Sequence, residues 1–358
     1  MRRGAARTTP VTGPRAGNRD GVASTRSGLT VAVTGPTGTF GFALMALLEA
    51  DAQVGTVTGI ARRRFDAAAH GWTKMGYRRG DVRDPAALEQ AFAGADVVVH
   101  LAFHLTGRAG RDTIRAINVE GTMNAFAAAT AAGAERFVYA SSVAAYGFDS
   151  DNPVGMTEDW PTRPAEHLFY AREKAEIERL LQDAATVHPQ VGLFLLRPPV
   201  VLGPHAVGAK SFVPSPLEPV ARRLARLALA LPVAPPMPVA PLALQLIHEE
   251  DVGGALRLCV VGAGPPGAYN IAGDGELTAV DVARELGLRA VAVPQAPVQA
   301  AARLLAALPF APPSLGWVEA LAAPVIMDTS KARRELGFIP RRSGLQALRA
   351  TLASQRAG

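Results

Sequence analysis

Residues 29–41 read LTVAVTGPTGTFG, and this stretch decides the fold. Leu29–Val33 is a short apolar run that ends at a glycine turn, which predicts a buried parallel strand. Residues 42–50, FALMALLEA, have a helical pattern. Of the three glycines in the turn, the first permits the tight bend, the second lets the backbone approach a pyrophosphate, and the third allows close helix–strand packing. The stretch therefore predicts a strand–turn–helix unit whose helix N-terminus faces an anion.

The same alternation of strands and helices continues along the chain. We predict further strands at 54–61, 77–80, 96–102, 136–141 and 191–196, and helices at 85–93, 112–132 and 166–183. Each strand is almost continuously apolar, as expected for strands buried on both faces. The predicted class is therefore α/β, with a Rossmann-type doubly wound parallel sheet.

The regular alternation of predicted strands and helices ends after Arg197. Residues 204–247 are proline-rich and predicted to be irregular, followed by helices at 250–261, 278–286, 296–307 and 330–336 and a short strand at 269–271. We therefore expect a nucleotide-binding domain over 29–203. Residues 204–358 should form mainly a smaller substrate-capping lobe, a few of whose elements pack back on that domain. Residues 1–28, rich in Arg, Gly, Ser, Thr and Pro, should form a disordered basic tail.

Composition excludes several classes of protein. With 358 residues, 49% hydrophobic and 19% charged, the chain can bury a sizeable core. The single cysteine, Cys259, excludes an intramolecular disulfide framework and a Cys-rich zinc site, and favours a reducing, cytoplasmic setting. Most of the net charge of +6 comes from six arginines in the first 28 residues. A basic nucleic-acid groove in the folded body is therefore not expected.

One uncharged segment, Leu227–Ile247, is long enough to span a bilayer. It contains five prolines, and each would cost a helix about 3 kcal/mol at an interior site. We predict an irregular, buried or lid-forming segment and no integral membrane span.

Two further patterns carry chemistry. Tyr170 and Lys174 lie four residues apart on a predicted helix, so they share one face. A phenol has a pKa of about 10, and a nearby ammonium would lower it toward the range useful for acid–base catalysis. Ser141 and Ser142 end a predicted strand, where open α/β sheets place their ligands. Alone, each pattern would fit an ordinary surface pair or a turn-capping serine.

Taken together, these motifs resemble one known family. From about residue 29 to 340 the chain is similar to the extended short-chain dehydrogenases/reductases, the NAD(P)-dependent epimerase/dehydratase family. The matching segments, in order, are TGPTGTFG (34–41), GDVRD (80–84), VVVHLAF (97–103), INVEGT (117–122), FVYASSVAAYG (137–147), YAREK (170–174), LRPPVVLGP (196–204), IHEEDV (247–252) and DTSKARRELGF (328–338).

The resemblance implies three catalytic residues. Ser142 occupies the position of the family's catalytic serine, and Tyr170 would be the acid–base group. Lys174 would bind the nicotinamide ribose and lower the pKa of the tyrosine. We expect no metal site, because no group of His, Cys and Asp residues has the spacing of metal ligands.

The resemblance also implies the residues around an NAD(P) cofactor. Those expected at the pyrophosphate are Gly35, Thr37, Gly38, Thr39, Phe40 and Gly41. Asp81 and Val82 would lie at the adenine, Leu101 and Ala102 along the cleft, and Asn118 beside it. Arg197 and Pro198 would close the nicotinamide side.

The chain departs from the family at the ribose position. An acid that would bind an NAD ribose is expected about twenty residues after the glycine turn, where Ala61 stands. Arg62, Arg63 and Arg64 follow it, and Arg62 and Arg63 could accommodate the 2′-phosphate of NADP. The sequence therefore favours NADP and leaves NAD open.

A second departure concerns the substrate. Nucleotide-sugar members usually carry an arginine just before the segment matched by IHEEDV, where this chain has Leu244. An apolar pocket does not compensate a buried diphosphate. We therefore predict hydride transfer on a small or apolar alcohol or ketone. A nucleotide-sugar epimerase or dehydratase acting through a keto intermediate, and a non-catalytic dinucleotide-binding sensor or scaffold, remain alternatives. The expected partner is a small-molecule substrate, and a homodimer remains possible.

Overall fold

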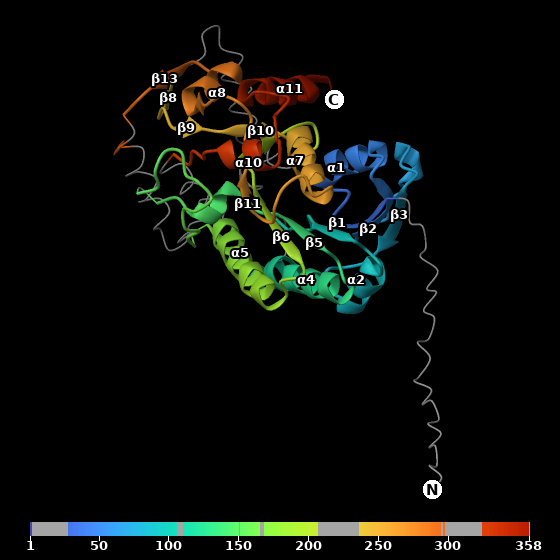
Figure 1. The fold of residues 1–358 in the computed structure, drawn as a ribbon. Coiled ribbons are helices and arrows are strands. Elements are labelled where there is room, and N and C mark those ends of the chain that lie inside the picture. The colour runs from blue at the N-terminus through green and yellow to red at the C-terminus, as the bar shows by residue number, and fades with distance from the viewer. Residues whose placement is uncertain are drawn as a thin grey trace.

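The computed structural model describes Met1 and residues 28–105, 110–149, 151–164, 168–206, 236–294, 296–297 and 324–357. Its centre is a seven-stranded parallel sheet with the order β11-β6-β5-β4-β1-β2-β3 (Figure 1). The strands are β1 (Leu29–Thr34), β2 (Val54–Ala61), β3 (Met75–Arg79), β4 (Val97–His100), β5 (Arg136–Ala140), β6 (Gly192–Arg197) and β11 (Gly267–Asn270). The predicted Rossmann-type sheet is confirmed, and β2 has the predicted bounds.

Helices cover both faces of this sheet, as Figure 1 shows. Helices α1 (Thr39–Ala50) and α7 (Glu249–Val260) lie on one face, and α2 (Pro85–Phe92), α4 (Gly121–Ala131) and α5 (Phe169–Val187) lie on the other. The alternation of side chains along β1 divides the core accordingly: Val31 and Val33 pack in one cluster, and Ala32 packs in the other. Burial on both faces explains why these strands are continuously apolar.

The connection between β4 and α4 departs from a simple helix. The predicted helix over 112–132 is divided into α3 (Arg111–Arg115), a π-helical turn η2 (Ala116–Glu120) and α4. Two short 3₁₀ turns, η1 (Ala68–His70) and η3 (Val143–Tyr146), follow β2 and β5. The extra residue in a π turn changes which side chains face inward, and such turns often occur at functional sites.

The C-terminal lobe contains more regular structure than predicted. The expectation of an irregular segment over 204–247 was wrong for its described part, which contains short strands that pair with partners elsewhere in the chain. After β6, and apart from α7 and β11, the elements are β7 (Val200–Leu202), β8 (Met237–Val239), β9 (Ala243–Leu244), β10 (Leu246–His248), β12 (Leu277–Thr278), α8 (Ala279–Glu285), β13 (Ala290–Ala292), α10 (Ser330–Glu335) and α11 (Gly344–Ala357). Helix α11 was not predicted. Of the helix predicted over 296–307, only residues 296–297 are described, and the predicted tail lies outside the described residues apart from its two ends.

Two elements of the C-terminal half join the sheet domain. Strand β11 pairs in parallel with β6, from Gly267 opposite Phe194 to Asn270 opposite Arg197. Helix α7 packs along α1 and places Val252, with its neighbours, in the apolar cluster that contains Val31. Within the described ranges, every helix is too short or too polar to cross a membrane.

Candidate functional site

The glycine turn lies between β1 and α1 at the carboxyl edge of the sheet. Gly35 has a left-handed φ of +67°, and a Cβ there would lie 3.0 Å from the amide nitrogen of Ala102. A Cβ on Gly41 would lie 2.5 Å from the carbonyl of Gly35, so both positions require glycine. Gly38 is exposed and starts α1 without a side-chain cap. Together the turn and the uncapped amides fit the pyrophosphate of a dinucleotide.

A buried histidine fixes the loop that follows β4. The hydroxyl of Thr122 donates its proton to the carbonyl of Asn118 and therefore accepts from Nε2 of His100, 3.0 Å away. Nδ1 of His100 then accepts from Thr34 Oγ1 at 2.9 Å. Burial, and secondarily the charge of Lys174, lowers the pKa of His100 to about 3. His100 is therefore a neutral structural residue.

Thr34 connects His100 to the loop that follows β4. Its Oγ1 accepts from the backbone amides of Leu101 and Ala102 at 3.1 and 3.2 Å. These two residues were predicted to line the cofactor cleft, and they are partly buried directly against Gly35. The structure thus brings the glycine turn and the loop after β4 together.

Asn118 lies buried in the π turn that follows β4 and α3. It is fully buried, accepts from the amide of His104 at 2.7 Å, and donates to the His104 carbonyl and to Glu173 at 3.0 and 2.8 Å. Asn118 sits in the π turn, which directs its amide inward to support the loop after β4. Its expected place beside the cofactor stays a prediction.

Ser142 and Tyr170 meet at the carboxyl end of β5. Ser142 begins η3, and its Oγ accepts from the amide of Ala144 at 3.2 Å, so it caps this turn. Its side chain also hydrogen bonds to Tyr170. Burial raises the pKa of Tyr170, and the bond from Ser142 opposes that rise. The phenol ring of Tyr170, which is partly exposed, packs edge-on against Phe103 at 5.6 Å.

Lys174 lies on the same helix face as Tyr170 and is 3% exposed. Its Nζ donates to the Tyr139 hydroxyl at 3.0 Å and to the Ala140 carbonyl at 2.7 Å, and lies 4.0 Å from the centroid of the Phe103 ring. The two hydrogen bonds use two of the three ammonium protons. Burial lowers the pKa of Lys174 to about 7, against the opposing charges of Glu178 and Glu173. The hydrogen bond from Ser142 lowers the pKa of Tyr170. The expected lowering by Lys174 stays a prediction.

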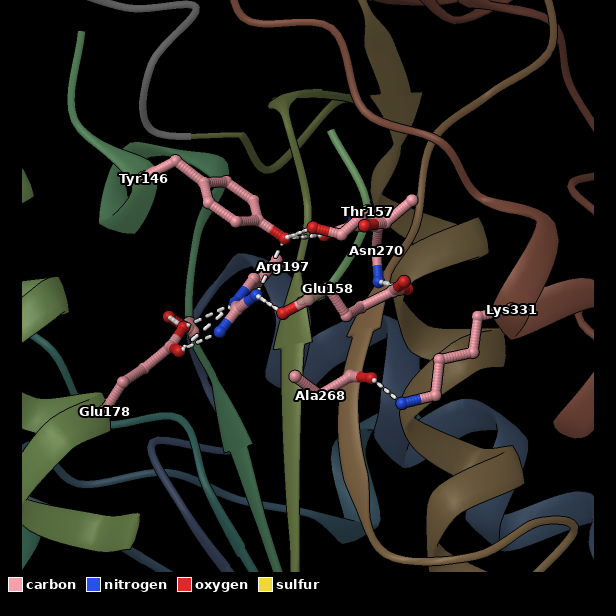
Figure 2. Close-up of polar contacts among 9 residues, drawn as sticks. Tyr146, Thr157, Glu158, Glu178, Arg197, Ala268, Asn270 and Lys331 are labelled. Atoms are coloured by element: carbon pink, nitrogen blue, oxygen red, sulfur yellow. Dashed lines mark hydrogen bonds and ion pairs between the residues drawn. The ribbon is translucent and has the colours of Figure 1, made fainter. Parts of the chain in front are cut away.

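Arg197 is buried between α5 and η3. Figure 2 shows its guanidinium between Glu178 and Tyr146. It is 2% exposed, pairs with both carboxylate oxygens of Glu178, and donates to the Tyr146 hydroxyl at 2.7 Å. These bonds raise the pKa of Arg197, against the opposing effect of burial. Closure of the nicotinamide side by Arg197 and Pro198 stays a prediction.

Cations gather at the ends of β2 and β3. Ala61 ends β2, and Arg62 and Arg63 follow it as exposed side chains. Asp81 forms a two-bond ion pair with Arg83, which holds the pKa of Asp81 below its ordinary value, with a smaller contribution from Arg62. Val82, the second residue predicted at the adenine, is buried beside this pair.

Residues 236–247 of the lobe contain no charged side chain. Leu244 is partly buried in β9, and Gln245 exchanges two hydrogen bonds of 2.9 Å with the backbone of Met327. The side chain of Gln245 therefore joins two segments of the lobe. Throughout the described ranges, no group of three or more His, Cys, Asp or Glu could hold a metal ion.

Sequence reasoning missed Glu178 and Glu173. Glu178 lies four residues after Lys174 and eight after Tyr170, so the helical spacing was a signal that could have found it. Glu173 gave no such signal, because it precedes Lys174 directly and becomes relevant only through its bond to Asn118.

Comparisons with known proteins agree with this architecture. The chain is 30% identical over 332 residues to the uncharacterized protein y4nG of Sinorhizobium fredii, covering 89% of this chain and 76% of that protein. An N-acetyl-alpha-D-glucosaminyl-diphospho-ditrans,octacis-undecaprenol 4-epimerase of Escherichia coli is 37% identical over a shorter stretch of 126 residues. That stretch covers 35% of this chain and 37% of the epimerase. The solved structure of DesIV, a dTDP-glucose 4,6-dehydratase from Streptomyces venezuelae with NAD and TYD bound, has a TM-score of 0.66 at 21% identity, covering 92% of this chain and 98% of that chain.

A family model gives the assignment. The model of the NAD dependent epimerase/dehydratase family matches residues 31–272, which is more than half of the chain and includes the glycine turn, Ser142, Tyr170 and Lys174. The expected resemblance is thereby confirmed. The chain belongs to the NAD-dependent epimerase/dehydratase family and is an NAD(P)-dependent enzyme.

Proposed function

We propose that this enzyme is an oxidoreductase that moves a hydride between a nicotinamide and a secondary alcohol or ketone. The observation that carries the proposal is the meeting of Ser142, Tyr170 and Lys174 at the carboxyl end of β5. Open α/β sheets bind their ligands at this edge. The glycine turn at Gly35 lies at the same edge and suits the pyrophosphate of the cofactor.

Each side chain has one task in this reaction. The Tyr170 hydroxyl gives its proton to the substrate oxygen during reduction and takes it back during oxidation. The Ser142 hydroxyl, bonded to Tyr170, holds and polarises the same oxygen. Lys174 directs its remaining ammonium proton to the nicotinamide ribose. When bound, the cofactor supplies or accepts the hydride.

For the cofactor we propose NADP in preference to NAD. Arg62 and Arg63 are exposed at the end of β2, and Ala61 puts no carboxylate beside the ribose. In the described part of the chain, neither arginine forms an ion pair. Both are therefore available to a 2′-phosphate, which arginine binds through charge-assisted hydrogen bonds.

For the substrate we propose a small or apolar molecule held between the sheet domain, residues 29–203, and the lobe that follows it. Support comes from the uncharged strands β8, β9 and β10 and from Leu244, which stands where nucleotide-sugar relatives usually place arginine. Burial of apolar surface would supply the affinity, at about 25 cal/mol per Å².

A second candidate is epimerisation or dehydration of a diphosphate-linked sugar. It is favoured by the similarity to the Escherichia coli epimerase over about a third of the chain. The same Ser142, Tyr170 and Lys174 would serve this reaction, with the hydride returned within one catalytic cycle.

A substrate panel distinguishes the two candidates. The protein is mixed with NADPH or NADP and a panel of ketones, secondary alcohols and diphosphate-linked sugars, and the absorbance of the reduced nicotinamide is followed. Net oxidation or reduction with a ketone or alcohol supports the oxidoreductase. Conversion of a sugar with retained cofactor and no net absorbance change would contradict it and support the epimerase.

A further inference from the structure

Glu178 joins the helix that carries Tyr170 to the strand end that carries Ser142. It lies eight residues after Tyr170 on α5, and none of its side chain is exposed. One carboxylate oxygen accepts from Ser141 Oγ at 2.5 Å, and both oxygens accept from Arg197. Ser141 directly precedes Ser142. The carboxylate of Glu178 on α5 is therefore bonded to the residue next to Ser142.

Arg197 holds the other flank of the same turn. Its guanidinium donates to the hydroxyl of Tyr146, the last residue of η3, and lies 4.6 Å from the centroid of that ring (Figure 2). The next residue, Pro198, accepts from the amide of Val143 at 2.9 Å. Ser141, before Ser142, is thus bonded to Glu178, and Val143, after it, is bonded to the residue that follows Arg197.

The network extends from Tyr146 into the lobe. The Tyr146 hydroxyl lies 2.8 Å from Asn270 Oδ1 and 3.1 Å from the Thr157 carbonyl. Asn270 also donates to the carbonyls of Met156 and Asp328. Figure 2 shows Thr157 and Asn270 on the side of Arg197 opposite Glu178. The polar atoms of the pair are thus satisfied within the protein.

Stability alone does not account for this pair. Burying a carboxylate and a guanidinium removes both from water, and their attraction often fails to offset that cost. Apolar residues of similar volume are frequently as stable or more stable. Such residues would remove the bond from Ser141 to Glu178 and the bond from Arg197 to Tyr146, although Tyr146 would keep its contacts with Asn270 and Thr157. The charged pair therefore adds one bond at each end of the turn that contains Ser142.

We propose that Glu178 is a positioning residue, held in place by Arg197, which aligns Ser142 with Tyr170. The inference rests on the proposed oxidoreductase function, because it assigns a role in that reaction. An error of about 1 Å in the placement of reacting groups can cost about 100-fold in rate. A residue that acts through Ser142 should therefore affect turnover more than binding.

The Ser141→Ala variant gives the sharpest test, because it removes the bond to the strand end and leaves the Glu178–Arg197 pair intact. We expect kcat to fall by about 10- to 100-fold. The cofactor Kd and the Tm should stay close to the parent values. Glu178→Gln should lower kcat as well, with a larger loss of Tm, because the Arg197 charge loses its partner.

Glu173→Gln is the matched control. Glu173 is another buried carboxylate beside Lys174, but it accepts a hydrogen bond from the side-chain amide of Asn118. If kcat falls equally in the Glu173 and Glu178 variants, lost charge near Lys174 explains the effect and the proposal is overturned. An unchanged kcat in Ser141→Ala would also overturn it.

A crystal structure of Ser141→Ala provides a readout independent of activity. The proposal expects the hydrogen bond between Ser142 and Tyr170 to be broken or lengthened, and an unchanged bond contradicts it. The proposed function has its own test: it is wrong if Tyr170→Phe keeps full turnover. Even then, the crystal structure of Ser141→Ala still shows whether Glu178 aligns Ser142 with Tyr170.

Discussion

The Lys174 ammonium donates a hydrogen bond to the hydroxyl of Tyr139 across 3.0 Å. This bond fixes the lysine to β5, with its Nζ 5.9 Å from the centroid of the Tyr170 ring. Because burial lowers the pKa of Lys174 to about 7, its charged and neutral forms are balanced near neutral pH. The residue therefore links the protonation of the site to the stability of the fold.

The first prediction concerns Lys174 and pH. Between about 7 and the ordinary value of 10.5, the unfolded chain binds a proton on Lys174 that the folded chain lacks. The free energy of unfolding should therefore rise with pH across this window and fall as pH drops toward 7. The Lys174→Met variant lacks this dependence. Urea unfolding of both proteins without cofactor, from pH 7 to 10, measures the difference, and a constant difference would contradict the prediction.

His100 should make the protein sensitive to acid. Its pKa is about 3 in the folded protein and 6.5 ordinarily, so the unfolded chain binds more protons between these values. The stability it contributes is present above pH 6.5 and is lost as pH falls, by up to about 1.4 kcal/mol per pH unit. His100→Gln keeps a donor and an acceptor and does not titrate. Denaturant unfolding from pH 7 to 4.5 should show the parent losing more stability than this variant, with exposed His70→Gln as the control.

Loss of the phenol should remove catalysis and spare binding. In Tyr170→Phe we expect kcat to fall by about 10²–10⁴, the usual contribution of a general acid–base group. The cofactor Kd should change little, because the ring and its contact with Phe103 remain. Steady-state kinetics and cofactor titration measure the two quantities, and full turnover in the variant would refute the assigned mechanism.

Cofactor choice should depend on the end of β2. Arg62→Ala and Arg63→Ala should each weaken NADP binding by about 10- to 100-fold, the value of one charge-assisted hydrogen bond, and leave NAD binding nearly unchanged. Ala61→Asp should shift preference toward NAD, because its carboxylate accepts from the ribose hydroxyls and repels a 2′-phosphate. Fluorescence titration with both reduced cofactors tests this, with surface Arg179→Ala as the control. A parent that prefers NAD, and variants that behave like it, would show that the arginines have no such role.

Nucleotide sugars should bind weakly. A diphosphate needs several strong donors, and Leu244 supplies none at the position where relatives usually place arginine. We expect a Kd above about 1 mM for uridine- or thymidine-diphosphate sugars with the cofactor-loaded protein. Leu244→Arg should tighten this binding, whereas apolar ketones should bind the parent better. Calorimetric titration measures each Kd, and micromolar binding of a nucleotide sugar to the parent would restore the epimerase as first choice.

Much of the site was predictable because its signals are local. The turn at Gly35 follows an apolar run and precedes a helical one, so its place between β1 and α1 could be read from neighbouring residues. The spacing of Tyr170 and Lys174 puts them on one face of α5 whatever packs against it. Ser142 follows a strand, and strands of a parallel sheet end at a common edge.

The sequence by itself determined the strand–turn–helix units and the residues able to carry chemistry, because periodicity and turn geometry act over a few residues. Only the tertiary structure decided that β11 adds the seventh strand, that Asn118 turns inward, and that Arg197 pairs with Glu178. These outcomes depend on which surfaces meet after the chain folds back on itself. A buried charge takes the partner that lies opposite it in space, and no spacing along the chain specifies that partner.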